Sequence, residues 1–190
     1  MSLIAIVHHS GYGHTRKQAE AVLAGLEAAG ATAALITIGD DGTIEEHEWE
    51  VLDRTDAIVF GSHTYMGMAS WQFKRFADAT SKRWFTQVWK DKLAAGFTNS
   101  ASMNGDKHST LHYFITLAMQ HAMVWVGTGM MPANAKASTR DDINYLGAYA
   151  GLMAQSPADA GTDEAPPAGD ITTAREFGRR IAEATRALKG

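Results

Sequence analysis

The sequence predicts an α/β fold, a doubly wound three-layer sandwich around a five-stranded parallel sheet. Short apolar runs alternate along the chain with longer segments whose apolar residues recur at helical spacing. The apolar runs lack the alternation of a half-exposed strand, which indicates burial on both faces, as in a parallel sheet. Because crossover connections are right-handed, the helices must be divided between the two faces, and we expect the strand order 2-1-3-4-5.

Two strands and two helices are expected in the first part of the chain. Ser2–Val7 is a short run rich in Ile and Val, and Thr15–Ala29 repeats Ala, Val and Leu at helical spacing before a stop at Gly30. Thr32–Ile38 is the second apolar run and ends in the turn sequence GDDG. Ile44–Leu52 follows as a short helix with a weak pattern.

The middle of the chain supplies three more strands and two helices. The strands are the apolar runs Asp56–Ser62, Lys92–Ser100 and Met123–Gly127. Between them, Trp71–Thr80 is expected to be helical because its Trp and Phe residues can share one face. Ser109–His121 is the second helix of this region.

The chain ends in a long irregular connection and a helix. Ala133–Gly169 has no clear period and holds three of the four prolines in its second half. A connection of this length is either an ordered insertion or a flexible flap. Asp170–Leu188 is a long amphipathic helix. No repeat interrupts this plan, so we expect a single domain over residues 1–190.

The composition limits the classes of function. Hydrophobic residues make up 45% and charged residues 20%, and the net charge of −4 gives no basic surface for nucleic acid or an anionic membrane. The absence of cysteine excludes disulfides, thiol catalysis and thiolate-bound metals. The N-terminal apolar run is too short for a signal peptide, and no stretch is long enough to span a bilayer. We therefore expect a cytoplasmic protein without nucleic-acid or membrane partners.

The loop after the first strand, HSGYGHT, combines hydroxyl side chains with glycines at the start of a helix. Arg16 stands where GxGxxG needs a small residue, and no GK[ST] is present, so neither well-known nucleotide loop is indicated. Ser10, Gly11, Gly13 and Thr15 would instead present neutral donors and the positive end of a helix dipole to one phosphate. An ordinary Ser/Thr cap with a tight glycine turn is the alternative.

Two further loops follow strands whose carboxyl ends should lie at the same edge of the sheet. In the second loop, Tyr65 and Met66 offer flat or soft apolar surface for a planar ring, and Gly67 allows the backbone to bend. The third loop, Thr98–Asp106, is small and polar, which suits hydrogen bonds to the edge of a heterocycle. Taken singly, each of these is better explained as an ordinary loop.

Together the loops resemble those of the flavodoxin-like superfamily, and most of all the WrbA-type NAD(P)H:quinone oxidoreductases and their FMN reductase relatives. The matching pieces occur in order over most of the chain: SGYGHT, TYMGMASWQFKRFAD, KLAAGFTNSAS, HAMVWVG and YLGAYAG. The resemblance implies a flavodoxin-like fold with FMN as cofactor, NADPH or NADH as electron donor and a quinone as acceptor. It also implies a homotetramer, or at least a homodimer, with shared active sites.

The resemblance assigns the FMN contacts to three loops and one histidine. The first loop would hold the phosphate, the second would lie along the isoalloxazine ring, and the third would line the ring edge and the ribityl chain. The implied cofactor-binding residues are Ser10, Gly11, Tyr12, Gly13, His14, Thr15, Thr64, Tyr65, Met66, Gly67, Asn99, Ser100, Ala101, Ser102, Met103, Asn104 and His121.

Three residues acquire catalytic or substrate roles through the same resemblance. Tyr12 would lie near the incoming nicotinamide nucleotide, and Trp84 would reach the active site of a neighbouring subunit. His121 would act beside the flavin as a hydrogen-bond donor or proton source, because a histidine pKa can lie near neutrality. Without the resemblance, His121 is better explained as a packing residue. The chain departs from the family at His63, where a proline is usual, and in its glycine-poor third loop.

The implied reaction is a ping-pong transfer of two electrons, in which NAD(P)H reduces FMN and leaves before a quinone takes the electrons from the same face. The alternatives are a one-electron carrier of the flavodoxin type and a binding protein without a substrate of its own. No loop displays a site for a 2′-phosphate, so the sequence does not decide whether NADH or NADPH is the electron donor. His108 and His112 have helical zinc spacing but lack the glutamate of HExxH and any cysteine partner, so no metal is expected.

Overall fold

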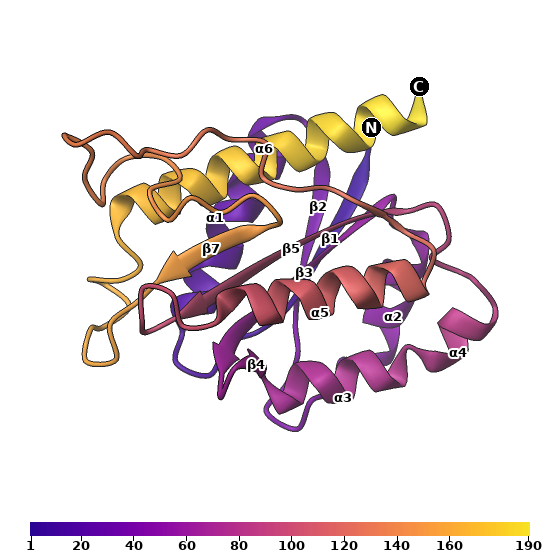
Figure 1. Cartoon of the computed structure of the whole chain (residues 1–190). Helices are drawn as coiled ribbons and strands as arrows, with labels where there is room; N and C mark the ends of the chain where they lie inside the picture. The colour runs from indigo at the N-terminus through magenta and orange to yellow at the C-terminus, as the bar shows by residue number, and fades with distance from the viewer.

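A seven-stranded sheet forms the centre of the computed structural model, which describes residues 1–190. The main path of the sheet has the order β2-β1-β3-β5-β6, and all of its neighbouring strands are parallel (Figure 1). In that order the strands are Thr32–Thr37, Leu3–His9, Ala57–Tyr65, Leu93–Ser100 and Val124–Trp125. These are the five predicted strands in the predicted order, so the doubly wound, flavodoxin-like fold is confirmed.

Two short strands were not predicted. β4 (Met68–Ala69) pairs antiparallel with the end of β3, and β7 (Leu152–Gln155) pairs parallel with the second half of β5. The fifth position of the sheet is therefore shared, because β6 pairs only with Leu93 and Ala94 at the start of β5. A strand of four residues inside a long connection gives too little periodicity to be seen in the sequence.

The chain leaves the sheet after β6 and returns to it as β7. The indole Nε1 of Trp125 in β6 donates to the carbonyl oxygen of Ala150 at 2.6 Å. This hydrogen bond joins the two ends of the connection between β6 and β7. Gly151 passes close to β5, where an added Cβ would lie 2.7 Å from the carbonyl oxygen of Gly96. Within the irregular segment expected from residue 133, part of the chain is thus an element of the sheet.

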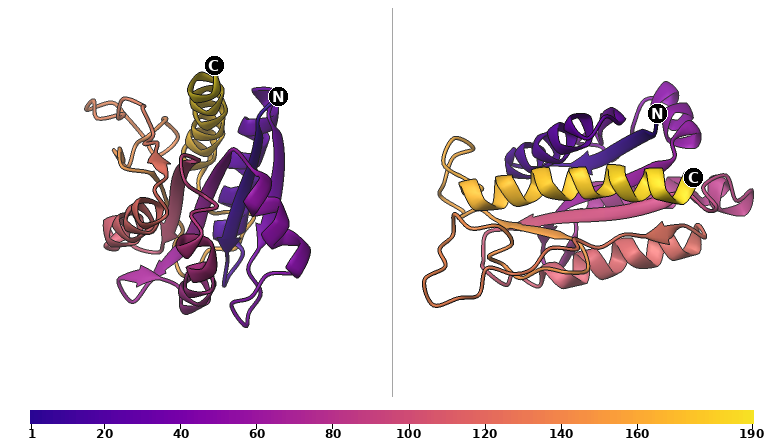
Figure 2. Two further views of the ribbon diagram at one scale, coloured as in Figure 1. Left: turned by 90° about the vertical axis from the view of Figure 1, so that its right-hand side faces the viewer. Right: turned by 90° about the horizontal axis from the view of Figure 1, so that it is seen from above.

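The chain has six helices, and five of them cover the two faces of the sheet (Figure 2). The six helices are α1 (His14–Ala28), α2 (Glu46–Arg54), α3 (Trp71–Ala79), α4 (Ser81–Phe85), α5 (Lys107–Gln120) and α6 (Ala168–Lys189). α1 and α6 pack on one face, whereas α2, α3 and α5 supply the core of the other face. None of these helices is both long enough and apolar enough to cross a membrane.

Alternate residues of each central strand point into two separate cores. Ile4 and Ile6 of β1 pack with residues of α1 and α6, whereas Ala5 and Val7 pack with residues of α2, α3 and α5. All four side chains are fully buried. This double burial explains why the strand is a continuous apolar run in the sequence.

α1 and α6 approach each other closely because glycines lie at their contact. A Cβ on Gly25 would collide with the carbonyl oxygen of Arg175, and a Cβ on Gly178 would collide with the carbonyl oxygen of Val22. The contact holds α1 against the sheet, and α1 begins directly after the first loop. The glycines therefore help to position the amino end of α1.

Replacing Gly25 by Ala should destabilise the protein, although alanine is the better helix former by about 1 kcal/mol. The expected loss is about 1–3 kcal/mol, because the added methyl group has no space between the helices. Thermal unfolding measures the change, with Glu27→Ala at an exposed position of the same helix as the control. A Tm for Gly25→Ala equal to or above that of the control would contradict the close contact.

Candidate active site

A cleft of about 510 Å³ opens at the carboxyl edge of the sheet, where β1, β3, β5 and β7 end. All three predicted loops reach it, together with a fourth segment that follows β7. The lining residues are Tyr12, His14, His63–Tyr65, Asn99–Ala101, Ser156–Ala158 and Ala160–Thr162. We refer to this space as the loop cleft.

The first loop is organised by the hydroxyl of Ser10. Its Oγ accepts hydrogen bonds from the N–H groups of Gly13 and Arg16, each at 3.1 Å. Gly13 has a φ of +90°, which favours glycine, and α1 begins there without a side-chain cap. The N–H groups of His14 and Thr15 have no acceptor within the chain. The amino end of α1 therefore offers free donors to a ligand.

The second loop is a two-residue hairpin between β3 and β4. Tyr65 pairs with Met68, and the two central residues, Met66 and Gly67, have φ values of +49° and +80°. Positive φ at both central positions is the requirement of a type I′ turn. Behind the hairpin, the Thr64 hydroxyl bonds to the hydroxyls of Thr98 at 2.8 Å and Thr110 at 2.7 Å.

The third loop contributes only its first part to the loop cleft. Asn99 and Ser100 are buried at the end of β5, and Ala101 is exposed beside them. Ser102, Met103 and Asn104 were predicted as cofactor contacts, but the structure places them on the exposed turn beyond the lining.

A fourth segment, which the sequence did not predict, also lines the loop cleft. Residues 156–162 close over the first loop, where Ala160 O lies 3.0 Å from the Nε2 of His14 and Thr162 O accepts from the Nζ of Lys17 at 2.6 Å. The Ser156 hydroxyl donates to the Oδ1 of Asn99 at 3.1 Å. The turn-rich sequence SPADAGT was a usable signal, but no sequence pattern showed where a long connection returns.

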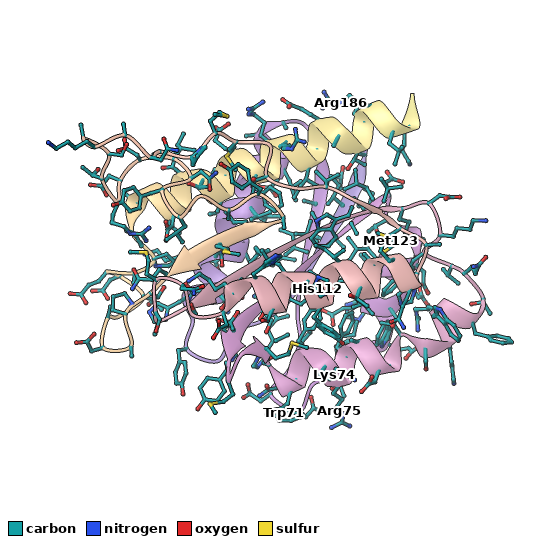
Figure 3. All side chains as sticks on the ribbon, viewed as in Figure 1. Trp71, Lys74, Arg75, His112, Met123 and Arg186 are labelled. Carbon is teal, nitrogen blue, oxygen red and sulfur yellow. The ribbon has the colours of Figure 1, made fainter.

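A second cleft of about 880 Å³ adjoins the first. Three residues, Tyr12, His63 and Tyr65, line both clefts and form the wall between them. Beyond this wall the second cleft extends along α3, whose residues Trp71, Lys74 and Arg75 contribute to its lining. All three are labelled in Figure 3. Its other lining residues include His9, Asp40, Met66 and Asp78. We call this space the α3 cleft.

The half-buried imidazole of His63 in this wall packs against the buried imidazole of His9, which lines only the α3 cleft. The rings of His9 and His63 lie 5.4 Å apart, and that of His63 lies 6.1 Å from the ring of Tyr65. Burial lowers the pKa of His63 to about 4, and it lowers the pKa of His9 as well. Both rings are therefore neutral at pH 7. Neither nitrogen of His9 has a hydrogen-bond partner within the chain.

His121 and Trp84 do not join the three loops. His121 follows the last residue of α5, so the whole helix, about 20 Å long, lies between it and the third loop. Its Nε2 lies 2.9 Å from the Thr80 hydroxyl, and its ring packs on Trp89 at 4.6 Å. Trp84 and His121 instead line a separate cleft of about 370 Å³. Within one chain, His121 therefore lies away from the loop cleft.

No group of three or more histidine and acidic side chains is placed to hold a metal ion. His108 and His112 lie on the exposed side of α5, with ring centroids 6.4 Å apart; His112 is labelled in Figure 3.

Comparison with known proteins gives consistent results. Residues 3–137 match the model of the NADPH-dependent FMN reductase family. The chain is 50% identical to flavodoxin FldP of Pseudomonas aeruginosa, over 96% of each protein. It is 32% identical to an NAD(P)H dehydrogenase (quinone) of Geobacter sulfurreducens, over 98% of this chain and 99% of the relative. The crystal structure of a WrbA-like flavodoxin from Agrobacterium tumefaciens superposes with a TM-score of 0.80 at 44% identity, over 98% and 99% of the two chains.

His121 should make the protein sensitive to acid. Burial lowers its pKa from 6.5 to about 4, so between these values the unfolded chain binds a proton that the folded chain does not. Stability should fall as the pH drops from about 6.5 towards 4, and His121→Gln should reduce the slope by up to about 1.4 kcal/mol per pH unit.

Urea unfolding at several pH values measures this slope. Gln120→Ala, at the exposed neighbouring position, is the control and should keep the slope of the unmodified protein. An unaltered slope in His121→Gln would contradict a buried, neutral His121.

Proposed function

The chain belongs to the NADPH-dependent FMN reductase family, as a WrbA-type member of the flavodoxin-like superfamily, and from this premise we propose that it is an NAD(P)H:quinone oxidoreductase. FMN is accordingly its cofactor, and NAD(P)H-dependent redox chemistry is its class of reaction. The observation that carries the proposal is the common wall of the two clefts, since this wall would place a second ligand directly beside the FMN.

The amino end of α1 fits the FMN phosphate. His14 and Thr15 offer free N–H groups, and the helix dipole adds partial positive charge at the same point. Ser10 holds the loop in shape by accepting two backbone hydrogen bonds, and its own O–H would remain available to donate to the phosphate. Gly11 passes so close to His63 that a Cβ would lie 3.4 Å from the imidazole Cε1.

The rest of the loop cleft fits a flat, polar-edged ring. Tyr65 is 61% exposed and offers an aromatic face on one side. Asn99–Ala101 and the 156–162 segment bring backbone and hydroxyl groups to the other side. Ser102, Met103 and Asn104 would act on the ring only through the shape of the loop.

Bound FMN would supply the redox chemistry, accepting two electrons from NAD(P)H and passing them to a quinone in a ping-pong sequence. The chain itself would hold the flavin in the loop cleft and bind each substrate in turn in the α3 cleft. Tyr12 lies in the wall between the clefts and is 78% exposed. Its ring would pack against the incoming nicotinamide or quinone. Neutral His63 would add a polar group to the same wall.

Trp84 and His121 would act between subunits. They lie together on one surface cleft away from the chain's own loops, and Trp84 is half exposed there. In the proposed homotetramer they would help to complete the flavin site of a neighbouring copy, with Trp84 as the exposed contact and the buried His121 behind it.

A one-electron carrier is the second candidate function. It is favoured by one observation, which is that the relative at 50% identity bears the name flavodoxin. The α3 cleft argues for the enzyme, because a carrier that meets only protein partners has no need of a second small-molecule space.

A spectroscopic experiment separates the candidates. We expect the protein loaded with FMN to be bleached by NADH or NADPH and to regain its colour on adding benzoquinone, over many turnovers. Bleaching without sustained benzoquinone reduction would reject the oxidoreductase in favour of the carrier. A protein that stays colourless after FMN is added would reject both and leave a fold without its flavin.

Replacing Gly13 by Ala should weaken FMN binding by about tenfold or more. Gly13 has a φ of +90°, and an added Cβ would lie 2.7 Å from the Cγ2 of Thr162, so the first loop and the segment above it must both shift. The dissociation constant, measured by quenching of FMN fluorescence, reports the change.

Gly30→Ala is the matched control for backbone strain. Gly30 also has a positive φ, +81°, but an added Cβ would meet no atom within 4 Å. We expect it to lower the Tm and leave the FMN dissociation constant unchanged. Equal FMN affinity in the two variants would remove the first loop from the phosphate site.

A further inference from the structure

A buried lysine lies directly behind the third loop. Lys107, the first residue of α5, is only 1% exposed, although lysine is among the residues least often buried. Its Nζ donates to the hydroxyl of Ser100 at 2.8 Å and to the carbonyl oxygens of Ser102 at 2.9 Å and Met103 at 2.8 Å. All three acceptors belong to the third loop, so a single ammonium group holds the loop in place.

The charge of Lys107 has no carboxylate in direct contact. The carboxylate that influences it, Asp170, is itself paired with Arg140 at 2.7 Å and accepts the N–H of Gln155 at 2.9 Å. Burial lowers the pKa of Lys107 to about 8, which leaves the group charged at pH 7. A positive charge therefore stays behind the loop without a counter-ion of its own.

Ser100 connects this charge to the loop cleft. The residue lines the cleft, and its hydroxyl accepts from Lys107 while donating to the carbonyl oxygen of Ser102 at 3.0 Å. One side chain thus separates the ammonium group from the ligand space. Electrostatic interactions are strengthened in a site with little water, so a charge at this depth acts on whatever the cleft holds.

We propose that Lys107 is a positioning residue for the flavin, which fixes the third loop and favours binding of reduced FMN over oxidised FMN. The inference rests on the proposed FMN site but not on the identity of the electron acceptor. The reduced ring is anionic at neutral pH once it has lost its more acidic proton, whereas the oxidised ring is neutral. A nearby cation therefore stabilises the reduced form more and raises the midpoint potential of the bound FMN.

Lys92 provides a matched control inside the same chain. Its Nζ donates to the carbonyl oxygens of Leu52 at 3.0 Å and of Asp53 and Thr55 at 2.6 Å each. Burial lowers its pKa to about 8 as well. It lies just before β5, at the opposite edge of the sheet from the loops, so it shares the structural role of Lys107 without proximity to the cleft.

The test measures the midpoint potential of bound FMN, together with Tm, in three variants. Lys107→Met removes the charge and the hydrogen bonds, Lys107→Gln keeps a donor without the charge, and Lys92→Met is the control. We expect both Lys107 variants to lower the affinity for reduced relative to oxidised FMN by about tenfold, which is about 30 mV for a two-electron couple.

Lys92→Met should lower the Tm without moving the potential. An unchanged potential in Lys107→Gln, or an equal shift in Lys92→Met, would overturn the proposal and leave Lys107 a purely structural residue. If Lys107→Met does not fold, the comparison of Lys107→Gln with Lys92→Met decides alone. Failure of the unmodified protein to bind FMN would reject the proposed function itself, which is a different result from unchanged potentials.

Discussion

Burial of β1, β3 and β5 on both faces is the constraint on which the rest of the molecule depends. Because neither face of these strands is open to water, polar groups for a ligand can gather only at the strand ends. The parallel direction brings all three carboxyl ends to one edge, where His9 pairs with Ser62 and His63 with Asn99. Two adjoining hydrogen-bonded ladders thus set the spacing of the loops around the cleft.

The shared fifth position of the sheet brings a fourth segment to the loop cleft. Since β6 ends after two residues, the place beside the second half of β5 is free for β7. β7 then delivers residues 156–162 to the same edge as the loops, and Gln155 ties it to Asp170 at the start of α6. That carboxylate also lies near Lys107, so the third loop, β7 and α6 are coupled through one small group of charges.

The sequence was sufficient for the five strands of the main path, their order and the three loops, because apolar runs and the small polar residues that end them are local signals. It was not sufficient for the two-residue strand β4, nor for β7 and residues 156–162, whose places are set by where a long connection returns. Lys107 also escaped prediction, since a lysine at the start of a helix is ordinarily exposed. For His121 the resemblance supplied a role that the chain cannot perform on its own loops, because α5 holds the residue at its far end.

The wall between the two clefts contains one of the two departures from the family pattern. A proline at position 63 would have no N–H to donate and no polar side chain, whereas the structure places an imidazole there between Gly11, His9 and Tyr65. The strand pairing is kept through His63 and Asn99, so the departure leaves the fold intact. The histidine instead changes the surface that both clefts share. Tyr12 and Tyr65 are mostly exposed, whereas His63 is half-buried and packs against the buried His9. The imidazole at position 63 is therefore the least exposed of the three side chains that form the wall.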